Sequence, residues 1–278
     1  MLMITFNNGY KIPQMGLGTF LMKPEEVNDV ITAAIDVGYR LFDTAQMYEN
    51  EKAIGKALKN SKLKREEYYI VSKLMYHHDI EKTKKLLDKS LVDLETSYID
   101  LFLIHWPNHN DKINIRTWKV LEEYYNKGKF KAIGVSNFTR YQLSKLLEEA
   151  TVKPVVNQVE MHPALTQEPT EAFLNDLDIR LMGYGPLMRG GVFNSPYKEE
   201  LETIGKKYNL NVAQTVIAWG LNRNIIMIPK TKTLSRLKEN FLASKVKMSD
   251  SDILKINKLN RGRRFYTDPA NTIHGPLI

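Results

Sequence analysis

Four titratable residues stand at or just beyond the ends of short apolar segments. Asp43, Lys73 and His105 each close such a segment, and Tyr48 follows Asp43 by five residues. Taken singly, each has an ordinary explanation: Asp43 as a helix cap and Lys73 as a charged strand end. Tyr48 would then be a packed loop aromatic and His105 a hydrogen-bonded histidine. Their common position at segment ends makes the four residues candidates for one site.

Together these side chains suit the reduction of an aldehyde or ketone, which needs a hydride at carbon and a proton at oxygen. A tyrosine is neutral at pH 7 and can donate that proton. A nearby ammonium stabilises the phenolate and lowers the pKa of the tyrosine, and an adjacent aspartate keeps the ammonium charged. A histidine N–H can orient the carbonyl. We therefore expect Tyr48 to be the acid, supported by Lys73, Asp43 and His105.

Short apolar segments rich in valine and isoleucine alternate with amphipathic helical stretches along the chain. Near-continuous apolar character is typical of parallel strands covered by helices. Eight βα units without an antiparallel interruption predict an α/β fold, a (β/α)8 TIM barrel, with the chemistry at the carboxyl ends of the strands. The expected strands are Gly16–Thr19, Tyr39–Asp43, Tyr69–Lys73, Ile99–His105, Ala132–Ser136, Val155–Glu160, Ile179–Tyr184 and Ile225–Lys230.

Two segments are expected to extend this barrel at its ends. Ile4–Phe6 and Tyr10–Ile12 flank the turn sequence Asn7-Asn8-Gly9, which predicts an amino-terminal β-hairpin. The sequence from Ser249 to Asp252 resembles a helix start and predicts an additional carboxyl-terminal helix. Because a barrel of this type takes about 250 residues, we expect residues 1–278 to form a single domain.

Two stretches are predicted to be irregular. The seventh and eighth strands are separated by a longer interval than the others, and its Gly190, Gly191 and Pro196 suggest a loop over the mouth of the barrel. The tail after Arg261, which includes Gly275 and Pro276, shows no periodic pattern.

Composition excludes several classes of protein. The net charge is +8, but the 40 Lys and Arg residues are interleaved with 32 Asp and Glu and form no nucleic-acid recognition pattern, so we expect no nucleic-acid partner. No apolar stretch reaches the roughly 18 residues of a membrane span, and none resembles a signal peptide. The absence of cysteine excludes disulfides and thiolate catalysis. We expect a cytoplasmic monomer that acts on a small molecule without a membrane or a metal.

Ordered motifs from Gly16 to about Asn260 resemble those of the aldo-keto reductases, particularly the prokaryotic type with short loops. The resemblance implies NADPH-dependent reduction of aldehydes or ketones by a (β/α)8 barrel, with the four residues above as the catalytic set. The motifs are GYRLFDTAQMY from Gly38 to Tyr48, IDLFLIHWP from Ile99 to Pro107, AIGVSNF from Ala132 to Phe138 and IPKTKTLSRLKEN from Ile228 to Asn240.

The same resemblance implies where the cofactor NADPH/NADP+ binds. Ser136, Asn137 and Gln158 would hydrogen-bond the nicotinamide carboxamide, and Tyr184 would stack on the ring. The incomplete glycine pattern at Gly16-Leu17-Gly18 argues against a Rossmann dinucleotide site. The residues that would instead hold the adenosine 2′-phosphate are Lys230, Thr231 and Arg236, with Glu239 and Asn240 near the adenine.

A helix expected after Thr231–Thr233 would place its amino terminus beside that phosphate, which suits a dianion. Lys232 stands where the family usually has an apolar residue, and either adds to this positive patch or is simply a solvated charge.

The substrate pocket is expected to be apolar and adaptable, with Phe20, Met75 and Trp106 as its walls. The resemblance fails at two positions: Gly185 follows Tyr184 where a serine is common, and Met75 stands where many relatives have an aromatic residue. A short loop after His105 predicts a fairly open mouth.

Two other functions remain as alternatives. The protein could bind NADPH as a redox-sensing or structural partner with little turnover, although the complete catalytic set argues against this. A phosphate-binding barrel isomerase would explain Lys230 but not Tyr48, Lys73 and His105 together.

Overall fold

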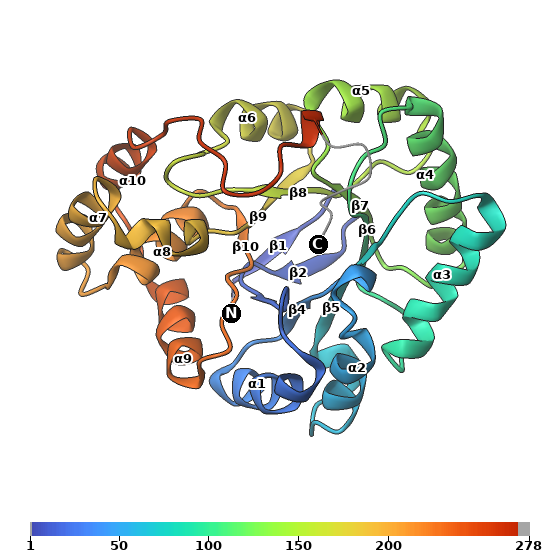
Figure 1. Ribbon diagram of the computed structural model, residues 1–278, viewed down its shortest axis with the longest axis horizontal. Helices are drawn as coiled ribbons and strands as arrows, with labels where there is room; N and C mark the ends of the chain where they lie inside the picture. Colours follow the sequence, from blue (N-terminus) through green and yellow to red (C-terminus); the bar gives the residue numbers. More distant parts are fainter. Residues whose placement is uncertain (1, 272–278) are drawn as a thin grey trace.

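The computed structural model describes residues 2–271 and contains a ring of parallel strands surrounded by helices (Figure 1). Each strand pairs with the next along the chain, from β3 to β10. Bridges between Met15 and Met227 and between Gly18 and Lys230 close the ring. The predicted (β/α)8 barrel is confirmed. Its strands are β3 (Leu17–Gly18), β4 (Leu41–Asp43), β5 (Tyr69–Leu74), β6 (Leu101–Ile104), β7 (Ile133–Ser136), β8 (Val156–Glu160), β9 (Arg180–Tyr184) and β10 (Ile226–Met227).

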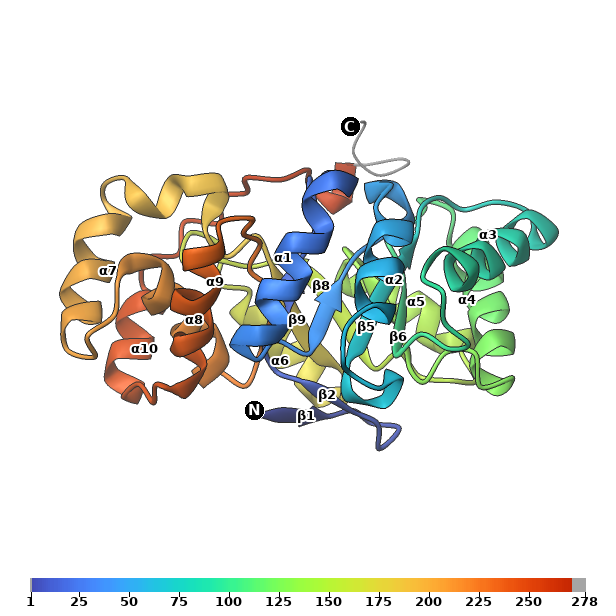
Figure 2. The same cartoon turned by 90° about the horizontal axis from the view of Figure 1, so that it is seen from below.

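The predicted hairpin is formed by β1 (Met3–Thr5) and β2 (Lys11–Pro13), with Ile4 opposite Ile12. It covers the amino-terminal end of the ring, which is the lower end in Figure 2. Ile12 and Phe6 are buried against strand residues such as Leu41 and Leu101 in the apolar interior of the barrel. Apolar side chains therefore fill the amino-terminal end of the barrel. The polar groups inside the barrel lie near its other end, the mouth formed by the carboxyl ends of the strands.

The helices form the outer layer and bury apolar faces against the strands. In α1 the buried residues Val27, Val30, Ile31 and Ala34 repeat at helical spacing, as the sequence predicts. Gly38 ends this helix with a φ of 118°, a conformation that glycine adopts at low cost. The helices are α1 (Pro24–Val37), α2 (Glu51–Lys59), α3 (Ile80–Asp93), α4 (Asp111–Asn126), α5 (Arg140–Glu149), α6 (Glu168–Asp176), α7 (Tyr197–Lys206), α8 (Val212–Asn222), α9 (Leu234–Leu242) and α10 (Asp250–Asn257).

The segment between β9 and β10, which the sequence predicts to be an irregular loop, is largely helical. It contains the 3-10 helix Met188–Phe193 and then both α7 and α8, so it adds one helix to the repeating unit. The predicted carboxyl-terminal helix is α10, capped by the side chain of Ser249. After α10 an extended segment crosses back over the mouth and reaches a short 3-10 helix, Pro269–Asn271 (Figure 1). Gly275 and Pro276 lie outside the described residues.

Membrane-spanning helices and metal-binding clusters are both absent from residues 2–271. No helix among them is long and apolar enough to cross a membrane. The same residues contain no group of three or more His, Cys, Asp or Glu side chains arranged to hold a metal ion.

Candidate active site

Strand alternation places the acidic and basic partners of the predicted site inside the barrel. Leu41 and Val71 face the interior cluster, so Asp43 and Lys73, two residues further on, face the same way. Lys73 Nζ lies 2.6 Å from Asp43 Oδ1 and donates a second hydrogen bond to the carbonyl of Thr44 at 2.7 Å. Burial lowers the pKa of Lys73 and raises the pKa of Asp43, while their mutual attraction opposes both changes. The predicted pairing of these residues agrees with the geometry.

Tyr48 lies beside this pair. It is the last residue of a 3-10 turn, Gln46–Tyr48, that follows β4. Lys73 Nζ is 5.1 Å from the centroid of the Tyr48 ring, and the rings of Phe20 and His105 lie 5.1 and 5.7 Å from it. From the sequence, Lys73 was expected to lower the pKa of this phenol. Instead, burial and the charge of Asp43 raise the pKa of Tyr48 well above its usual value, so the phenol is held protonated.

His105 follows β6 and is buried at 6% exposure. Burial and the neighbouring Lys73 ammonium lower its pKa well below the usual value. The imidazole is therefore neutral at pH 7 and carries one N–H. Its Nδ1 atom is buried without a hydrogen-bond partner in the described part of the chain. A neutral histidine at this place can orient a carbonyl oxygen without introducing a second positive charge next to Lys73.

The four residues predicted to contact nicotinamide form a connected group: Ser136 and Asn137 at the end of β7, Gln158 within β8 and Tyr184 at the end of β9. Asn137 donates from Nδ2 to the His105 carbonyl at 3.0 Å, and its Oδ1 accepts from the Tyr184 hydroxyl at 2.9 Å. Ser136 Oγ donates to the Gln158 carbonyl at 2.9 Å. Gln158 Nε2 donates to Asp43 Oδ2 at 2.7 Å. These four residues are thus hydrogen-bonded to one another and, through Gln158, to the Lys73–Asp43 pair.

The residues of the predicted phosphate clamp lie at the amino-terminal end of α9. Lys230 and Arg236 are exposed and form no ion pair within residues 2–271. Burial and the nearby Lys232 lower the pKa of Lys230. Lys232 itself pairs with Glu26 of α1 at 2.7 Å, so its charge is largely balanced. Two uncompensated cations at a helix amino terminus suit a dianionic phosphate.

The other two predicted adenosine residues also lie on α9. Asn240 is buried at 4% exposure, whereas Glu239 is exposed and its carboxylate accepts a long hydrogen bond of 3.4 Å from Asn211. Thr231 Oγ1 accepts from the backbone N–H of Thr233 at 3.1 Å, which fixes the turn into the helix.

The predicted pocket residues differ in how they are held. Phe20 packs on Tyr48, and Trp106 directly follows His105 and is 7% exposed. Met75 is half-buried at the end of β5, where its N–H donates to Gln46 Oε1 at 3.0 Å. Phe20 thus borders Tyr48 and Trp106 borders His105, whereas Met75 is bonded to Gln46 in the turn that carries Tyr48.

Tyr266 and Arg189, which were not predicted from the sequence, cover the same mouth. The Tyr266 ring lies edge-on to Tyr184 at 5.3 Å, and the Arg189 guanidinium lies 4.6 Å from the centroid of the Tyr266 ring. A Cβ atom at Gly185 would come within 2.5 Å of Tyr266. The glycine at position 185 was the only signal in the sequence, since glycine marks a close approach. These contacts place two further side chains next to Tyr184, while the open mouth predicted from the short loop after His105 stays a prediction.

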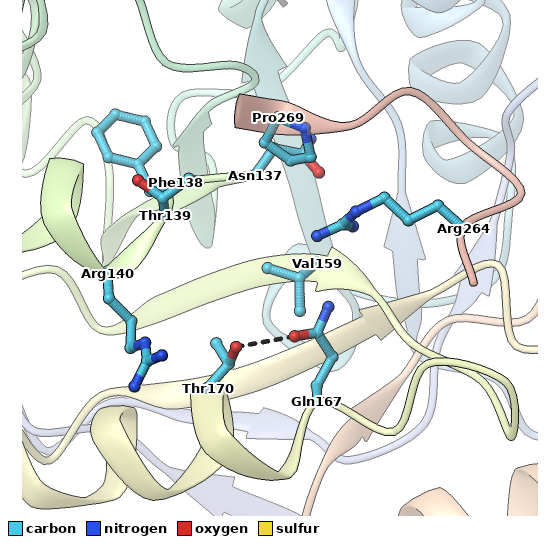
Figure 3. Close-up of a pocket in the computed structure, with 9 residues that line it drawn as sticks. All are labelled: Asn137, Phe138, Thr139, Arg140, Val159, Gln167, Thr170, Arg264 and Pro269. Carbon is cyan, nitrogen blue, oxygen red and sulfur yellow. Dashed lines mark hydrogen bonds between the residues drawn. The ribbon is translucent and has the colours of Figure 1, made fainter. Parts of the chain in front are cut away.

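Glu160 holds the segment that carries Tyr266. Its Oε1 accepts from the Phe265 N–H at 2.6 Å and from His162 at 2.8 Å, and Arg264 lies 3.6 Å from its Oε2. Arg264 also faces a cavity of about 190 Å³ between β7, β8 and the first turns of α5 and α6 (Figure 3). Asn137 lines this cavity but Tyr48, Lys73 and His105 do not, so it lies beside the catalytic group and is distinct from it.

The sequence and the fold both match proteins of one enzyme family. Glyoxal reductase of Bacillus subtilis (strain 168) is 39% identical over 268 residues, which is 96% of this chain and 95% of that protein. A crystal structure of an aldo-keto reductase from a Medee basin deep-sea metagenome library superposes with a TM-score of 0.93 at 36% identity, covering 97% of this chain and 99% of the other. A mutant of Gox0644 in complex with NADPH has a TM-score of 0.90 at 33% identity and covers 98% of each chain.

Residues 14–261 match the sequence pattern of the Aldo/keto reductase family, and they include all four catalytic candidates. Taken with the closed barrel and the group around Tyr48, this shows that the chain belongs to the aldo/keto reductase family.

Proposed function

We propose that this protein reduces aldehydes or ketones to alcohols with NADPH as the hydride donor, and that Tyr48 donates the proton. The observation that carries the proposal is the buried Lys73–Asp43 pair, whose ammonium lies 5.1 Å from the Tyr48 ring centroid, together with the His105 ring, whose centroid lies 5.7 Å from that of Tyr48. A carbonyl oxygen that gains negative charge during reduction needs a proton donor, a nearby positive charge and an N–H donor. Tyr48, Lys73 and His105 could supply these three.

Each residue has a separate task in this proposal. The Tyr48 hydroxyl, kept protonated by its high pKa, transfers its proton to the carbonyl oxygen. The Lys73 ammonium offsets the charge left on the phenolate, and Asp43 keeps that ammonium protonated in a buried place. The His105 N–H orients the carbonyl. The proton later returns to Tyr48 from solvent.

The residues of the mouth fit the cofactor. NADPH, when bound, supplies the hydride. Ser136, Asn137 and Gln158 would hold the carboxamide, which requires Asn137 and Gln158 to share or exchange their present hydrogen bonds. Tyr184 offers a ring face for stacking. The exposed charges of Lys230 and Arg236, with Thr231, Glu239 and Asn240 alongside, support a preference for the 2′-phosphate of NADPH over NADH.

The substrate we propose is a small aldehyde of the 1,2-dicarbonyl class, such as glyoxal. The relative from Bacillus subtilis is named for the reduction of glyoxal. Phe20, Met75 and Trp106 would form apolar walls close to Tyr48, and Tyr266, which packs on Tyr184, would restrict the space for a large substrate. A short molecule with two polar ends fits such a pocket better than a bulky one.

We also propose that residues 1–278 act as one domain and as a cytoplasmic monomer. One closed ring and one surrounding layer of helices account for nearly all the described residues, which supports a single folding unit. The absence of cysteine from the sequence is compatible with a reducing compartment.

The proposal is tested by following NADPH absorbance with purified protein against a panel of aldehydes, dicarbonyls and keto-sugars. The Tyr48→Phe variant should lose roughly 100-fold to 10,000-fold in kcat because it lacks the proton donor. Its affinity for NADPH, measured by fluorescence titration, should remain close to that of the wild type. A Tyr48→Phe variant with full activity would remove Tyr48 from the mechanism. NADPH binding by the wild type without turnover of any carbonyl would favour the redox-sensing alternative.

A further inference from the structure

A second buried carboxylate lies close to the catalytic pair without belonging to it. Glu51 is the first residue of α2, three residues after Tyr48, and is only 5% exposed. Its Oε1 accepts a hydrogen bond from Ser72 Oγ at 2.6 Å, and its Oε2 accepts one from Ser90 Oγ at 3.3 Å. These hydroxyls come from β5 and α3, so one carboxylate joins three elements around the site.

The contact with Ser72 acts on Lys73. Successive side chains of a strand point to opposite faces, so Ser72 points out to the helices where its neighbour Lys73 points into the barrel. Glu51 therefore holds β5 from the outside at the residue next to the catalytic lysine. A shift of the strand at Ser72 would move the Lys73 backbone with it.

The contact with Ser90 acts on the turn that carries Tyr48. Ser90 Oγ accepts a hydrogen bond from Gln46 Nε2 at 2.8 Å, and Gln46 is the first residue of that turn. Gln46 Nε2 also donates to the Leu86 carbonyl at 2.9 Å, and Gln46 Oε1 accepts from the N–H of Met75. The chain Gln46–Ser90–Glu51–Ser72 thus runs from the Tyr48 turn to the Lys73 strand with consistent donors and acceptors.

Glu51 also contributes charge. Its carboxylate raises the pKa of Lys73, as Asp43 does, against the lowering that burial causes. Burial, the largest cause, raises the pKa of Glu51 itself, and Ser72, Ser90 and Lys89 offset only part of this rise. Both carboxylate oxygens accept from hydroxyl groups, which is the pattern of an ionised glutamate.

We propose that Glu51 is a positioning residue for carbonyl reduction, which holds the strand of Lys73 and the turn of Tyr48 at a fixed separation and helps to keep Lys73 charged. The inference rests on the proposed function, because it assigns a role within that reaction. Glu51 is proposed to contact neither cofactor nor substrate, and to act only by positioning Tyr48 and Lys73.

The decisive variant is Glu51→Gln, which keeps the size and some of the hydrogen bonding but removes the charge. We expect kcat for glyoxal to fall roughly 10-fold to 100-fold, as small displacements of reacting groups do. The KM for NADPH should stay unchanged, since the cofactor residues lie on other elements. The alkaline limb of the kcat–pH profile should move to lower pH, because Lys73 then loses its proton more easily. Glu51→Asp restores the charge and should return that limb toward its wild-type position.

Glu122→Gln is the matched control. Glu122 is also buried, at 4% exposure, and accepts from the N–H groups of Thr151 and Val152 away from the site. This control should lower Tm without moving the pH profile. Ser90→Ala is a second test that leaves Glu51 in place: it interrupts the chain and should lower kcat with the KM for NADPH unchanged.

Two outcomes would overturn the inference. If Glu51→Gln and Ser90→Ala keep the wild-type kcat and pH profile and lose only Tm, Glu51 is a structural residue. If Glu51→Gln does not fold, a Ser90→Ala variant with full kcat leads to the same conclusion. A wild type that reduces no carbonyl is a different result: it refutes the proposed function, and the role of Glu51 falls with it.

Discussion

Lys73 Nζ and Asp43 Oδ1 lie 2.6 Å apart with both side chains almost completely withdrawn from solvent. A buried ion pair of this kind is costly to break on one side only, because the remaining charge is left without a partner. The loss of either residue alone should therefore destabilise the barrel as well as impair the proposed chemistry, and these two effects can be separated.

Replacing one member of the pair should destabilise the protein more than replacing both. Lys73→Met and Asp43→Asn, made singly, should each lower the free energy of unfolding by about 3–5 kcal/mol. The double variant should recover part of this loss while remaining inactive. Urea unfolding and NADPH oxidation measure the two effects. Additive losses of stability in the double variant would show that the residues act independently.

Arg236→Ala should weaken the preference for NADPH. The loss of charge-assisted hydrogen bonds to the 2′-phosphate should raise the KM for NADPH roughly 10-fold to 100-fold. The KM for NADH should hardly change, since NADH lacks that phosphate. Lys238→Ala, an exposed cation further along α9, serves as the control and should leave both values as they are. Wild-type protein that uses both cofactors equally well would refute the role assigned to Arg236.

Gly185→Ala should destabilise the protein through a contact with Tyr266. The added methyl group would meet the Tyr266 ring at 2.5 Å, and the φ of 63° at this position is unfavourable for any other residue. We expect a loss of about 1–3 kcal/mol from the overpacking, measured by thermal unfolding. Adding Tyr266→Ala should remove the steric part of the cost and leave the backbone part. An unchanged Tm for the single variant would mean that Tyr266 can move aside freely.

Asp252→Asn should reduce stability at neutral pH but not in strong acid. Asp252 accepts hydrogen bonds from Lys207 and Tyr208, and the lysine lowers its pKa to about 2 from the ordinary 3.8. A lowered pKa stabilises the fold above pH 3.8, and this contribution is lost as the pH falls through 2. The effect should be about 1 kcal/mol or less, because Lys207 is half exposed and solvent screens the pair. Urea unfolding of both proteins from pH 7 downward should show the two curves converging; a constant difference would contradict the assignment.

The sequence was sufficient for the barrel and for the residues that end its strands. Continuous apolar strands predict a barrel with its chemistry at the carboxyl ends of the strands, so Asp43, Lys73 and His105 were identified by position alone. It was not sufficient for α7, because Gly190, Gly191 and Pro196 are typical of loops and the helix begins only after them. It also predicted the wrong direction for the pKa of Tyr48, since burial depends on side chains from distant segments.

Tyr266 and Glu51 show why some residues near the site cannot be predicted from the sequence. Tyr266 is held over Tyr184 by contacts with Arg189 and by the anchoring of its neighbour Phe265 on Glu160, all from other parts of the chain. Glu51 has no motif of its own, and only the packing of α2 against β5 and α3 brings two serine hydroxyls to its carboxylate. Long-range contacts of this kind leave no periodic pattern to read.

The hairpin β1–β2 has a kinetic consequence. With Phe6 and Ile12 packed into the amino-terminal end of the ring, below the strands in Figure 2, that end of the barrel is filled by apolar side chains. The cofactor and the substrate of the proposed reaction would then both approach Tyr48 from the carboxyl-terminal end of the strands. In the proposed reaction the molecule that lies deeper should bind first and leave last, so we expect an ordered sequence of binding and release.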